Sequence, residues 1–444
     1  MTPHATFRAG RARTGPLTWG QSSVWGAMRQ TAPDDHYFNN GVVVAIPARL
    51  RPVSPERLAG ALGTVIERHE SLRTKLLRDD PTRQQVFADG SLPLTVVEAE
   101  PATEAETARQ LQAELVAPHF DYWEEWPLRA GVVTARGEVT QLVLAYCHVA
   151  ADGLGIDLVI RDLMAVLGGR PPRVPAPQPL ELAAWQRSDA GRRVADGAVA
   201  YWERELDRVP GATFDREVGT PQSPLVPQVS LASRALSLAV ARIAATRSVS
   251  SSTVLLSATT ALVAEVTGRE VCAMLPVVSN RFRPETVGVV STLSQQGLLV
   301  LETGGRPLPA LLTEARGRVL RAYRSALHDP ADRDRIAAAI GERLGTPPAH
   351  PLCCFNDQRM TIHTNNPTET PADDREIRAA LPESTIAWQG GHDNVQCRFC
   401  TQVWDEPGGM TYWLAANTRY LSTSDMERFV LRLEEMLVSA ALSS

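Results

Sequence analysis

A histidine and an aspartate lie close together in Leu142–Gly155, LVLAYCHVAADGLG. His148 follows an apolar run typical of a buried strand, and Asp152 and Gly153 begin the turn into a predicted helix. With an unperturbed pKa of about 6.5, a neutral imidazole can act as general base at pH 7. Asp152 can hold the turn or the imidazole in place, and Gly153 permits a backbone geometry or close approach that a side chain would block. A second interpretation stays open, in which His148 is a hydrogen-bonded strand-end residue and Asp152 an ordinary helix N-cap.

Cys147 stands directly before His148 and raises the question of a thiol nucleophile. Cysteine and histidine together perform covalent acyl transfer in some enzymes. Consecutive residues of a strand point to opposite faces, however, so we interpret Cys147 as a small buried residue. No metal site is expected, because the other candidate ligands lie on opposite faces of predicted strands: Cys353, Cys354, Cys397 and Cys400.

The first part of the chain alternates predicted strands with predicted helices, after a tail at 1–15 that is expected to be loose. Thr18 and Ser54 have side chains typical of helix N-caps, and Pro55 suits the first helical turn. The predicted helices cover 18–25, 54–66, 104–116 and 154–167, and the predicted strands cover 40–46, 94–97, 132–133 and 141–146. This mixture predicts a layered α/β fold.

A proline-rich segment, 171–179, is predicted to link an N-terminal part, 1–170, to a C-terminal part, 180–444. The second part also mixes the two kinds of element. Its predicted helices cover 180–208, 252–266 and 424–441, and its predicted strands or extended stretches cover 229–238, 271–278, 395–404 and 410–414. The polar stretch 360–380 is predicted to be a long surface loop.

Composition excludes several classes of protein. The 444 residues are 44% hydrophobic and 21% charged, which suits a globular chain with a substantial core. A net charge of −5, without a run of five like charges, argues against binding to nucleic acid. The N-terminus lacks the apolar core of a secretory signal, and no stretch is long and apolar enough to span a membrane. We therefore expect a cytoplasmic monomer that binds neither nucleic acid nor membrane.

The stretch around His148 resembles the His-His-x-x-x-Asp-Gly signature of nonribosomal peptide synthetase condensation domains, which belong with chloramphenicol acetyltransferase and related acyltransferases. Cys147 stands where the family has its first histidine, and His148 matches the second, which the family uses in catalysis. A block near Val287 is shortened by one residue, and Ser291 stands near its usual asparagine. Further blocks in the family's order extend the resemblance from about residue 15 to about residue 440: Leu17-Thr18 with Gln21 and Trp25, Arg68–Thr74, Phe120-Asp121, Pro127–Ala130, Trp185-Gln186, Tyr201-Trp202, Asn280-Arg281, Pro284-Glu285, Val287-Gly288, His350–Leu352 and Asn417–Leu421.

The resemblance implies two chloramphenicol acetyltransferase-like lobes arranged as a V, with the active site and His148 in a tunnel between them. It implies that Asp152 is structural and forms an ion pair with Arg281. His148 would accept a hydrogen bond and then the proton from the attacking group. The backbone N–H of Gly153 is a candidate to lie near the oxyanion that forms.

The implied function is that of a free-standing condensation enzyme in nonribosomal peptide synthesis or other secondary metabolism, including antibiotic biosynthesis. It would transfer an acyl or aminoacyl group from the phosphopantetheine arm of a carrier protein to an amine or alcohol, with no bound cofactor of its own. The expected partners are acyl or peptidyl carrier proteins, on the donor side and in one arrangement also on the acceptor side.

Two alternatives to this function stay open. The first is an acyltransferase that uses a small soluble acceptor. The second is a catalytically silent docking platform for partner proteins. The presence of His148, Asp152 and Gly153 favours catalysis, whereas Cys147 and the shortened block near Val287 favour the platform.

Overall fold

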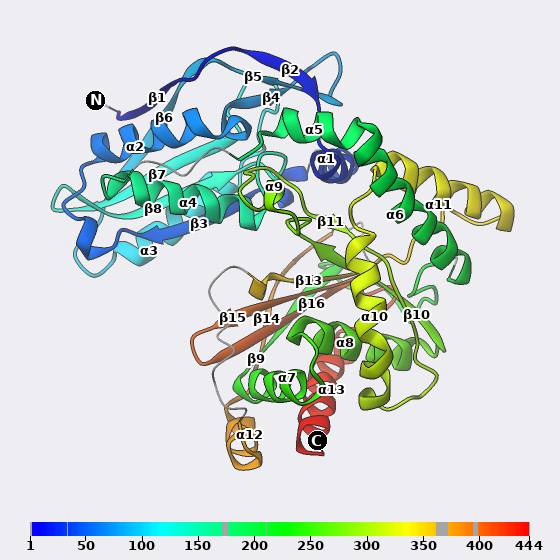
Figure 1. Cartoon of the computed structure of the whole chain (residues 1–444). Helices are drawn as coiled ribbons and strands as arrows, with labels where there is room; N and C mark the ends of the chain where they lie inside the picture. The colour runs from blue at the N-terminus through cyan, green and yellow to red at the C-terminus, as the bar shows by residue number, and fades with distance from the viewer. Residues whose placement is uncertain are drawn as a thin grey trace. The chain divides into compact units, whose positions relative to one another are not determined.

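The computed structural model describes residues 2–443 except 33, 171–175, 210, 361–371 and 394–397. The chain divides into two compact units (Figure 1). Unit 1 comprises Met1–Arg192 and Ser279–Ser294, and unit 2 comprises Arg193–Val278 and Gln295–Ser444. This division differs from the predicted boundary at 171–179, because residues 180–192 stay with unit 1 and Ser279–Ser294 returns to it. The predicted linker itself lies partly outside the described residues.

Unit 1 contains two sheets. Its strands are β1 His4–Arg8, β2 Arg13–Pro16, β3 Asn40–Ala45, β4 Thr74–Leu76, β5 Arg83–Val86, β6 Asp89–Glu98, β7 Leu128–Ala135 and β8 Glu138–Tyr146. The larger sheet has the order β1-β6-β7-β8-β3, and the smaller one has the order β2-β5-β4. The pairing of β6 with β7 is parallel, and the other pairings are antiparallel.

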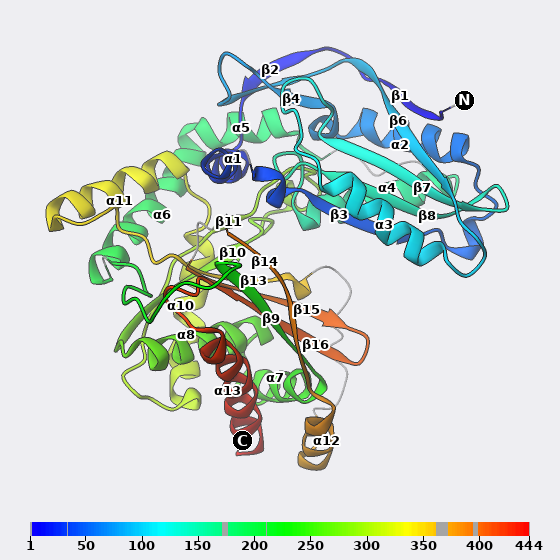
Figure 2. The same ribbon diagram turned by 180° about the vertical axis from the view of Figure 1, so that it is seen from behind.

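The helices of unit 1 cover both faces of the larger sheet. They are α1 Trp19–Thr31, α2 Pro55–Arg68, α3 Glu104–Val116, α4 Gly153–Leu167, α5 Pro179–Arg187 and α9 Pro284–Val287, with short 3-10 turns η1 Asp35–Phe38, η2 Ala48–Leu50 and η3 Glu70–Arg73. Leu142 and Leu144 of β8 are buried in the same cluster as α2 and α4 (Figure 1). Val143 between them is buried with α3 on the opposite face (Figure 2). The two-residue period of the strand therefore builds both cores.

Unit 2 is built on one eight-stranded sheet. Its strands are β9 Val226–Ser233, β10 Val271–Val278, β11 Gln295–Gln296, β12 Leu299–Glu302, β13 Cys353–Asp357, β14 Thr385–His392, β15 Phe399–Glu406 and β16 Gly409–Ala416. They follow the order β11-β10-β13-β15-β16-β9-β14, and β12 pairs with β10. Its helices are α6 Asp189–Arg208 (which begins in unit 1), α7 Arg234–Arg247, α8 Ser251–Thr267, α10 Leu308–Arg324, α11 Pro330–Leu344, α12 Asp374–Ala380 and α13 Thr423–Leu442, with 3-10 turns η4 Gln358–Met360 and η5 Leu381–Glu383.

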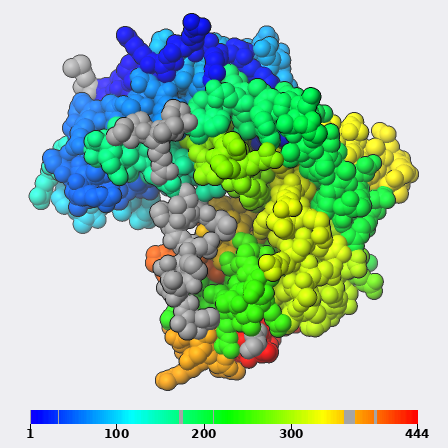
Figure 3. Space-filling view, viewed as in Figure 1, coloured from blue at the N-terminus to red at the C-terminus, as the bar shows by residue number. Residues whose placement is uncertain are grey.

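The same alternation separates the two cores of unit 2. Met274 of β10 is buried with α7, α8, α10 and α13. Its neighbour Leu275 is buried with Trp202 of α6 and Ile336 of α11. In the space-filling view, α6, α10 and α11 form the outer surface of this part of the unit (Figure 3). Both units therefore have the predicted mixed α/β layering.

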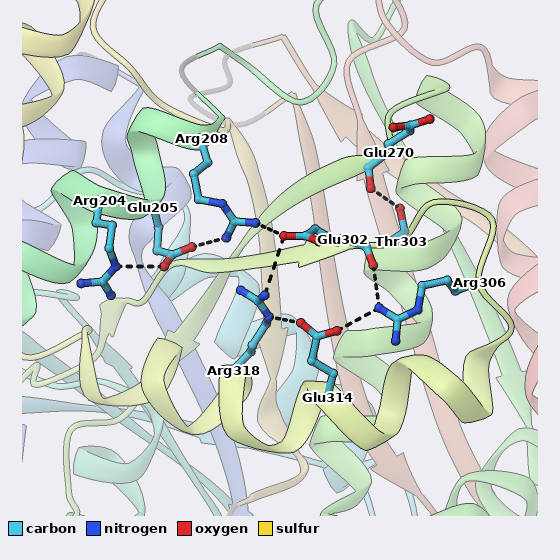
Figure 4. Close-up of polar contacts among 9 residues, drawn as sticks. All are labelled: Arg204, Glu205, Arg208, Glu270, Glu302, Thr303, Arg306, Glu314 and Arg318. Carbon is cyan, nitrogen blue, oxygen red and sulfur yellow. Dashed lines mark hydrogen bonds and ion pairs between the residues drawn. The ribbon is translucent and has the colours of Figure 1, made fainter.

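Ion pairs connect α6, β12 and α10 on the surface of unit 2 (Figure 4). Arg208 bonds Glu205 at 2.6 Å and also pairs with Glu302. Arg306 bonds Glu314 at 2.8 Å, and Arg318 pairs with Glu314 and lies 3.8 Å from Glu302. Because these carboxylates are all paired with arginine, we assign the group a structural role. Exposed ion pairs of this kind each contribute little to the free energy of folding.

Three sequence predictions are wrong. The loose tail at 1–15 instead forms β1 and β2, because β1 pairs with the distant β6 and points Ala5 and Phe7 into the core. The extended stretch 229–238 ends early, since the Ser233 hydroxyl accepts the Leu236 N–H at 2.8 Å and starts α7. The loop 360–380 contains α12, and its residues 361–371 lie outside the described part of the chain.

Candidate functional site

The turn between β8 and α4 comprises residues 147–152. At its start, the N–H of Cys147 donates to the carbonyl oxygen of Pro127 at 3.0 Å. At its end, Asp152 is the N-cap of α4, and its carboxylate accepts the N–H of Gly155 at 2.9 Å. The structure therefore has the strand, turn and helix that the motif predicts, and both interpretations of Asp152 require this geometry.

Asp152 and Arg281, far apart in sequence, form a buried ion pair with two bonds of 2.8 Å. Their side chains are 3% and 6% exposed. The same carboxylate accepts the N–H of Leu293 at 3.0 Å and both the N–H and the hydroxyl of Ser294, at 3.1 and 2.8 Å. Burial alone would raise the pKa of Asp152, but the Arg281 guanidinium and these donors hold that pKa below its usual value. The carboxylate is therefore ionised at pH 7 and joins α4 to the returning segment Ser279–Ser294.

His148 lies at the start of the turn and retains some solvent exposure. The Thr292 hydroxyl donates to the backbone oxygen of His148, and the same oxygen atom of Thr292 lies 3.5 Å from the imidazole Nδ1. The Gln21 amide donates to the backbone oxygen of Val149 at 3.3 Å. Burial lowers the pKa of His148, and the nearby Asp152 carboxylate opposes this only in part. The imidazole is therefore neutral at pH 7, which is the form that can accept a proton.

Cys147 is buried in a cluster with Leu17, Trp25 and Phe120. Burial raises the pKa of its thiol to about 12. At pH 7 the thiol is thus protonated, and the nucleophilic thiolate is not populated. These properties agree with the interpretation of Cys147 as a packed apolar residue.

Gly153 is exposed at the first turn of α4. A Cβ atom added there would meet no heavy atom within 4 Å. No described part of the chain therefore approaches Gly153 closely enough to exclude a side chain there. Its N–H at the N-terminal end of α4 remains the proposed neighbour of the oxyanion.

Sequence reasoning did not place three polar residues at the site: Gln21, which it named only as part of the resemblance, Thr292 and Ser294. Gln21 also closes a capping box with Thr18 at the start of α1, and the Thr-x-x-Gln spacing is a sequence signal for such a helix start. Its hydrogen bond to Val149 in the turn could not be predicted from the sequence, because the two residues lie 128 positions apart. The same holds for Thr292, which is 144 residues from His148.

Among the described residues, no group of three or more His, Cys, Asp or Glu side chains is placed to hold a metal ion, and Cys397 lies outside these residues. No single described helix is long and apolar enough to cross a membrane. Helices α7 and α8 meet that criterion only as a pair, with a bend of 108° between them.

Solved structures of condensation domains share this fold. One, described as the basis for condensation domain-mediated chain release from the enacyloxin polyketide synthase, has a TM-score of 0.72 at 20% identity and covers 97% of this chain and 83% of its own. The SgcC5 protein from Streptomyces globisporus has a TM-score of 0.70 at 19% identity, over 96% of this chain and 98% of its own. The chain thus has the chloramphenicol acetyltransferase-like α/β fold of condensation domains.

The family model described as Condensation domain matches residues 12–293, more than half of the chain. The chain therefore belongs to the condensation-domain family, as the resemblance predicted. A polyketide synthase-nonribosomal peptide synthetase of Aspergillus clavatus is 28% identical over 203 residues, 44% of this chain and 5% of that protein. The probable non-canonical nonribosomal peptide synthetase CymA of Salinispora arenicola is 29% identical over 330 residues, 69% of this chain and 4% of that protein. The chain thus spans no more than 5% of the length of these two relatives.

Condensation domains are acyltransferase-type, amide-forming units of nonribosomal peptide and polyketide synthesis. They act on substrates that carrier proteins hold on a phosphopantetheine arm.

Proposed function

We propose that this chain transfers an acyl or aminoacyl group from a carrier-bound thioester to an amine or alcohol, with His148 as the base. The observation that carries the proposal is the neutral, partly exposed imidazole of His148, held at the end of β8 in a chain of the condensation family. Asp152 and Arg281 are positioning residues in this proposal, since their contacts hold the turn and the segment Ser279–Ser294 together.

The proposed reaction needs no covalent enzyme intermediate. The acceptor nitrogen or oxygen attacks the thioester carbon while His148 accepts its proton. The carbon–sulfur bond then breaks, and the proton passes from His148 to the departing phosphopantetheine sulfur. General-base help of this kind typically contributes about 10²–10⁴-fold. The N–H of Gly153 is the proposed hydrogen-bond donor to the oxyanion.

Both amines and alcohols belong among the acceptors to be tested. Amide formation is the common outcome in the family. The SgcC5 structure, however, is described as a complex with (R)-(-)-1-(2-naphthyl)-1,2-ethanediol, which carries hydroxyl groups. A small soluble acceptor is therefore a chemically reasonable alternative to a second carrier protein.

A docking platform is the second candidate function. Cys147, in place of the family's first motif histidine, is the observation that favours it. A structure with this fold is described as a complex of the X-domain and OxyB from teicoplanin biosynthesis, with a TM-score of 0.68. The presence of a neutral His148 beside an intact Asp152–Arg281 pair favours catalysis over this candidate.

Intact-protein mass spectrometry of acyl-loaded carrier proteins separates the two functions. Carriers encoded beside the gene are mixed with wild type or His148→Ala and with amine, alcohol and carrier-bound acceptors. Transfer by wild type, and not by a folded His148→Ala protein, supports catalysis and identifies the acceptor class. Carrier binding without transfer, unchanged by the substitution, supports the docking platform instead.

A further inference from the structure

The hydroxyl of Thr292 contacts both the backbone and the ring of His148. It donates a hydrogen bond to the His148 carbonyl oxygen. Its oxygen also lies 3.5 Å from Nδ1 of the imidazole. Thr292 is 1% exposed, so water does not compete freely for these contacts.

The hydrogen-bonding capacity of a hydroxyl decides which tautomer of His148 fits. A threonine hydroxyl has one hydrogen and two acceptor lone pairs. Its hydrogen is already donated to the His148 carbonyl, so the hydroxyl oxygen presents only lone pairs to the ring. A neutral imidazole carries one N–H, and Nδ1 is therefore the nitrogen that should carry it. Nε2 then keeps the free lone pair that a general base requires.

Contacts from three sides hold Thr292 in this place. Asp152 accepts the backbone N–H groups of the next two residues, Leu293 and Ser294. Arg281 donates to the carbonyl of the preceding residue, Ser291, at 3.0 Å. On the third side, Gly20 of α1 packs so closely that an added Cβ would clash with the Thr292 carbonyl oxygen.

We infer that Thr292 is a positioning residue that fixes the orientation and the Nδ1–H tautomer of His148, and that the Asp152–Arg281 pair holds Thr292 in place for this role. The importance of this tautomer for catalysis rests on the proposed function, whereas the tautomer itself does not. The bonds of Asp152 go to Gly155, Arg281 and the segment after Thr292. The pair therefore bonds directly to the residues on either side of Thr292.

Two substitutions test the contribution of the Thr292 hydroxyl separately from that of its methyl group. Thr292→Val keeps the branched shape but removes the hydroxyl, and Thr292→Ser keeps the hydroxyl but removes the methyl group. Removing a partner that orients a reacting side chain typically costs roughly 10–100-fold in activity. We expect kcat to fall by roughly that factor in Thr292→Val with little change in KM, and Thr292→Ser to stay within about threefold of wild type.

Nitrogen-15 NMR of histidine-labelled protein tests the tautomer without any substrate. The His148 signals are assigned by their loss in His148→Gln. In wild type and Thr292→Ser, Nδ1 should carry the proton and Nε2 should have the shift of an unprotonated nitrogen. In Thr292→Val, a mixture of tautomers or an Nε2–H tautomer is expected. The inference is overturned if wild type has the Nε2–H tautomer or if Thr292→Val keeps the wild-type spectrum.

Different results would contradict the proposed acyl transfer and the proposed role of Thr292. Wild type without acyl transfer, but with the expected spectra, would remove the proposed function and leave the role of Thr292 in place. Acyl transfer that depends on His148, with Thr292→Val equal to wild type in both kcat and spectrum, would keep the function and overturn the role of Thr292. Circular dichroism of each variant confirms that the fold is retained before either comparison.

Discussion

Removing one member of the Asp152–Arg281 pair should unfold the site locally. In Arg281→Met, the Asp152 carboxylate stays buried, at 3% side-chain exposure, without its cation. In Asp152→Asn, the guanidinium is left unpaired, and the new amide group faces the N–H donors of Leu293 and Ser294. Breaking a buried pair from one side typically costs about 3–5 kcal/mol. The double variant should cost less than the sum of the singles, by about 0.5–3 kcal/mol, because the residues are in direct contact.

Hydrogen exchange measured by mass spectrometry is the suitable assay, because a chain of two units need not unfold in one step. Each 1.4 kcal/mol is a factor of ten, so opening of α4 and of Ser279–Ser294 should accelerate roughly 10²–10³-fold or more. Peptides from α13 in unit 2 should be unaffected. As a matched control, Glu314→Gln breaks the partly exposed pairs with Arg306 and Arg318, which should cost at most about 1 kcal/mol each. Unchanged exchange of α4 in both single variants, or equal acceleration in α13, would refute the reasoning.

Three further predictions concern buried groups. Burial lowers the pKa of His328 to about 3, below the value of about 6.5 for the unfolded chain, so its contribution to stability is complete above pH 6.5 and is lost as the pH falls toward 3. The denaturation midpoint should therefore fall less between about pH 7 and about pH 4.5 in His328→Gln than in wild type. Cys147, with a pKa of about 12, should resist iodoacetamide in the native protein and react on unfolding, as peptide mapping can follow. Gly20→Ala should accelerate exchange in α1 and lower acyl transfer, because the added Cβ would clash with Thr292, whereas Gly26→Ala on the same helix meets no atom within 4 Å and should do neither.

Each of these predictions has a contrary result. An equal pH dependence in wild type and His328→Gln would show that the buried imidazole is not the source of the acid sensitivity. Alkylation of Cys147 in the native protein at the rate of a free thiol would contradict its burial. Equal effects of the Gly20→Ala and Gly26→Ala substitutions would contradict the close packing of α1 on Thr292.

Elements with strong local signals could be predicted from the sequence. Ser54 followed by Pro55 marks the start of α2, and the side chain of Ser54 does accept an N–H at that cap. The predicted helix 104–116 coincides with α3. Elements that depend on distant partners could not be predicted. The strand β1 is stabilised by pairing with β6, and the five residues around Ala5 and Phe7 give too short a pattern to identify it alone.

The residues of the candidate site could be predicted where they belong to a recognisable sequence motif. His148, Asp152 and Arg281 follow from the resemblance, and the structure brings Asp152 and Arg281 into contact. Thr292 could not be singled out, because threonine is common and its role depends on a contact across 144 residues. The contacts of His148 with Thr292 and of Asp152 with Arg281 arise only because the segment Ser279–Ser294 returns to unit 1.

Single-turnover acyl transfer from a loaded carrier protein, compared between wild type and His148→Gln, tests the central claim most directly. Wild type should transfer the acyl group to an amine or alcohol, and its rate should persist below pH 6.5, because the pKa of His148 is lowered by burial. The folded His148→Gln protein should be slower by about 10²-fold or more. Equal transfer by the two proteins, or none by either while both bind the carrier, would contradict the account.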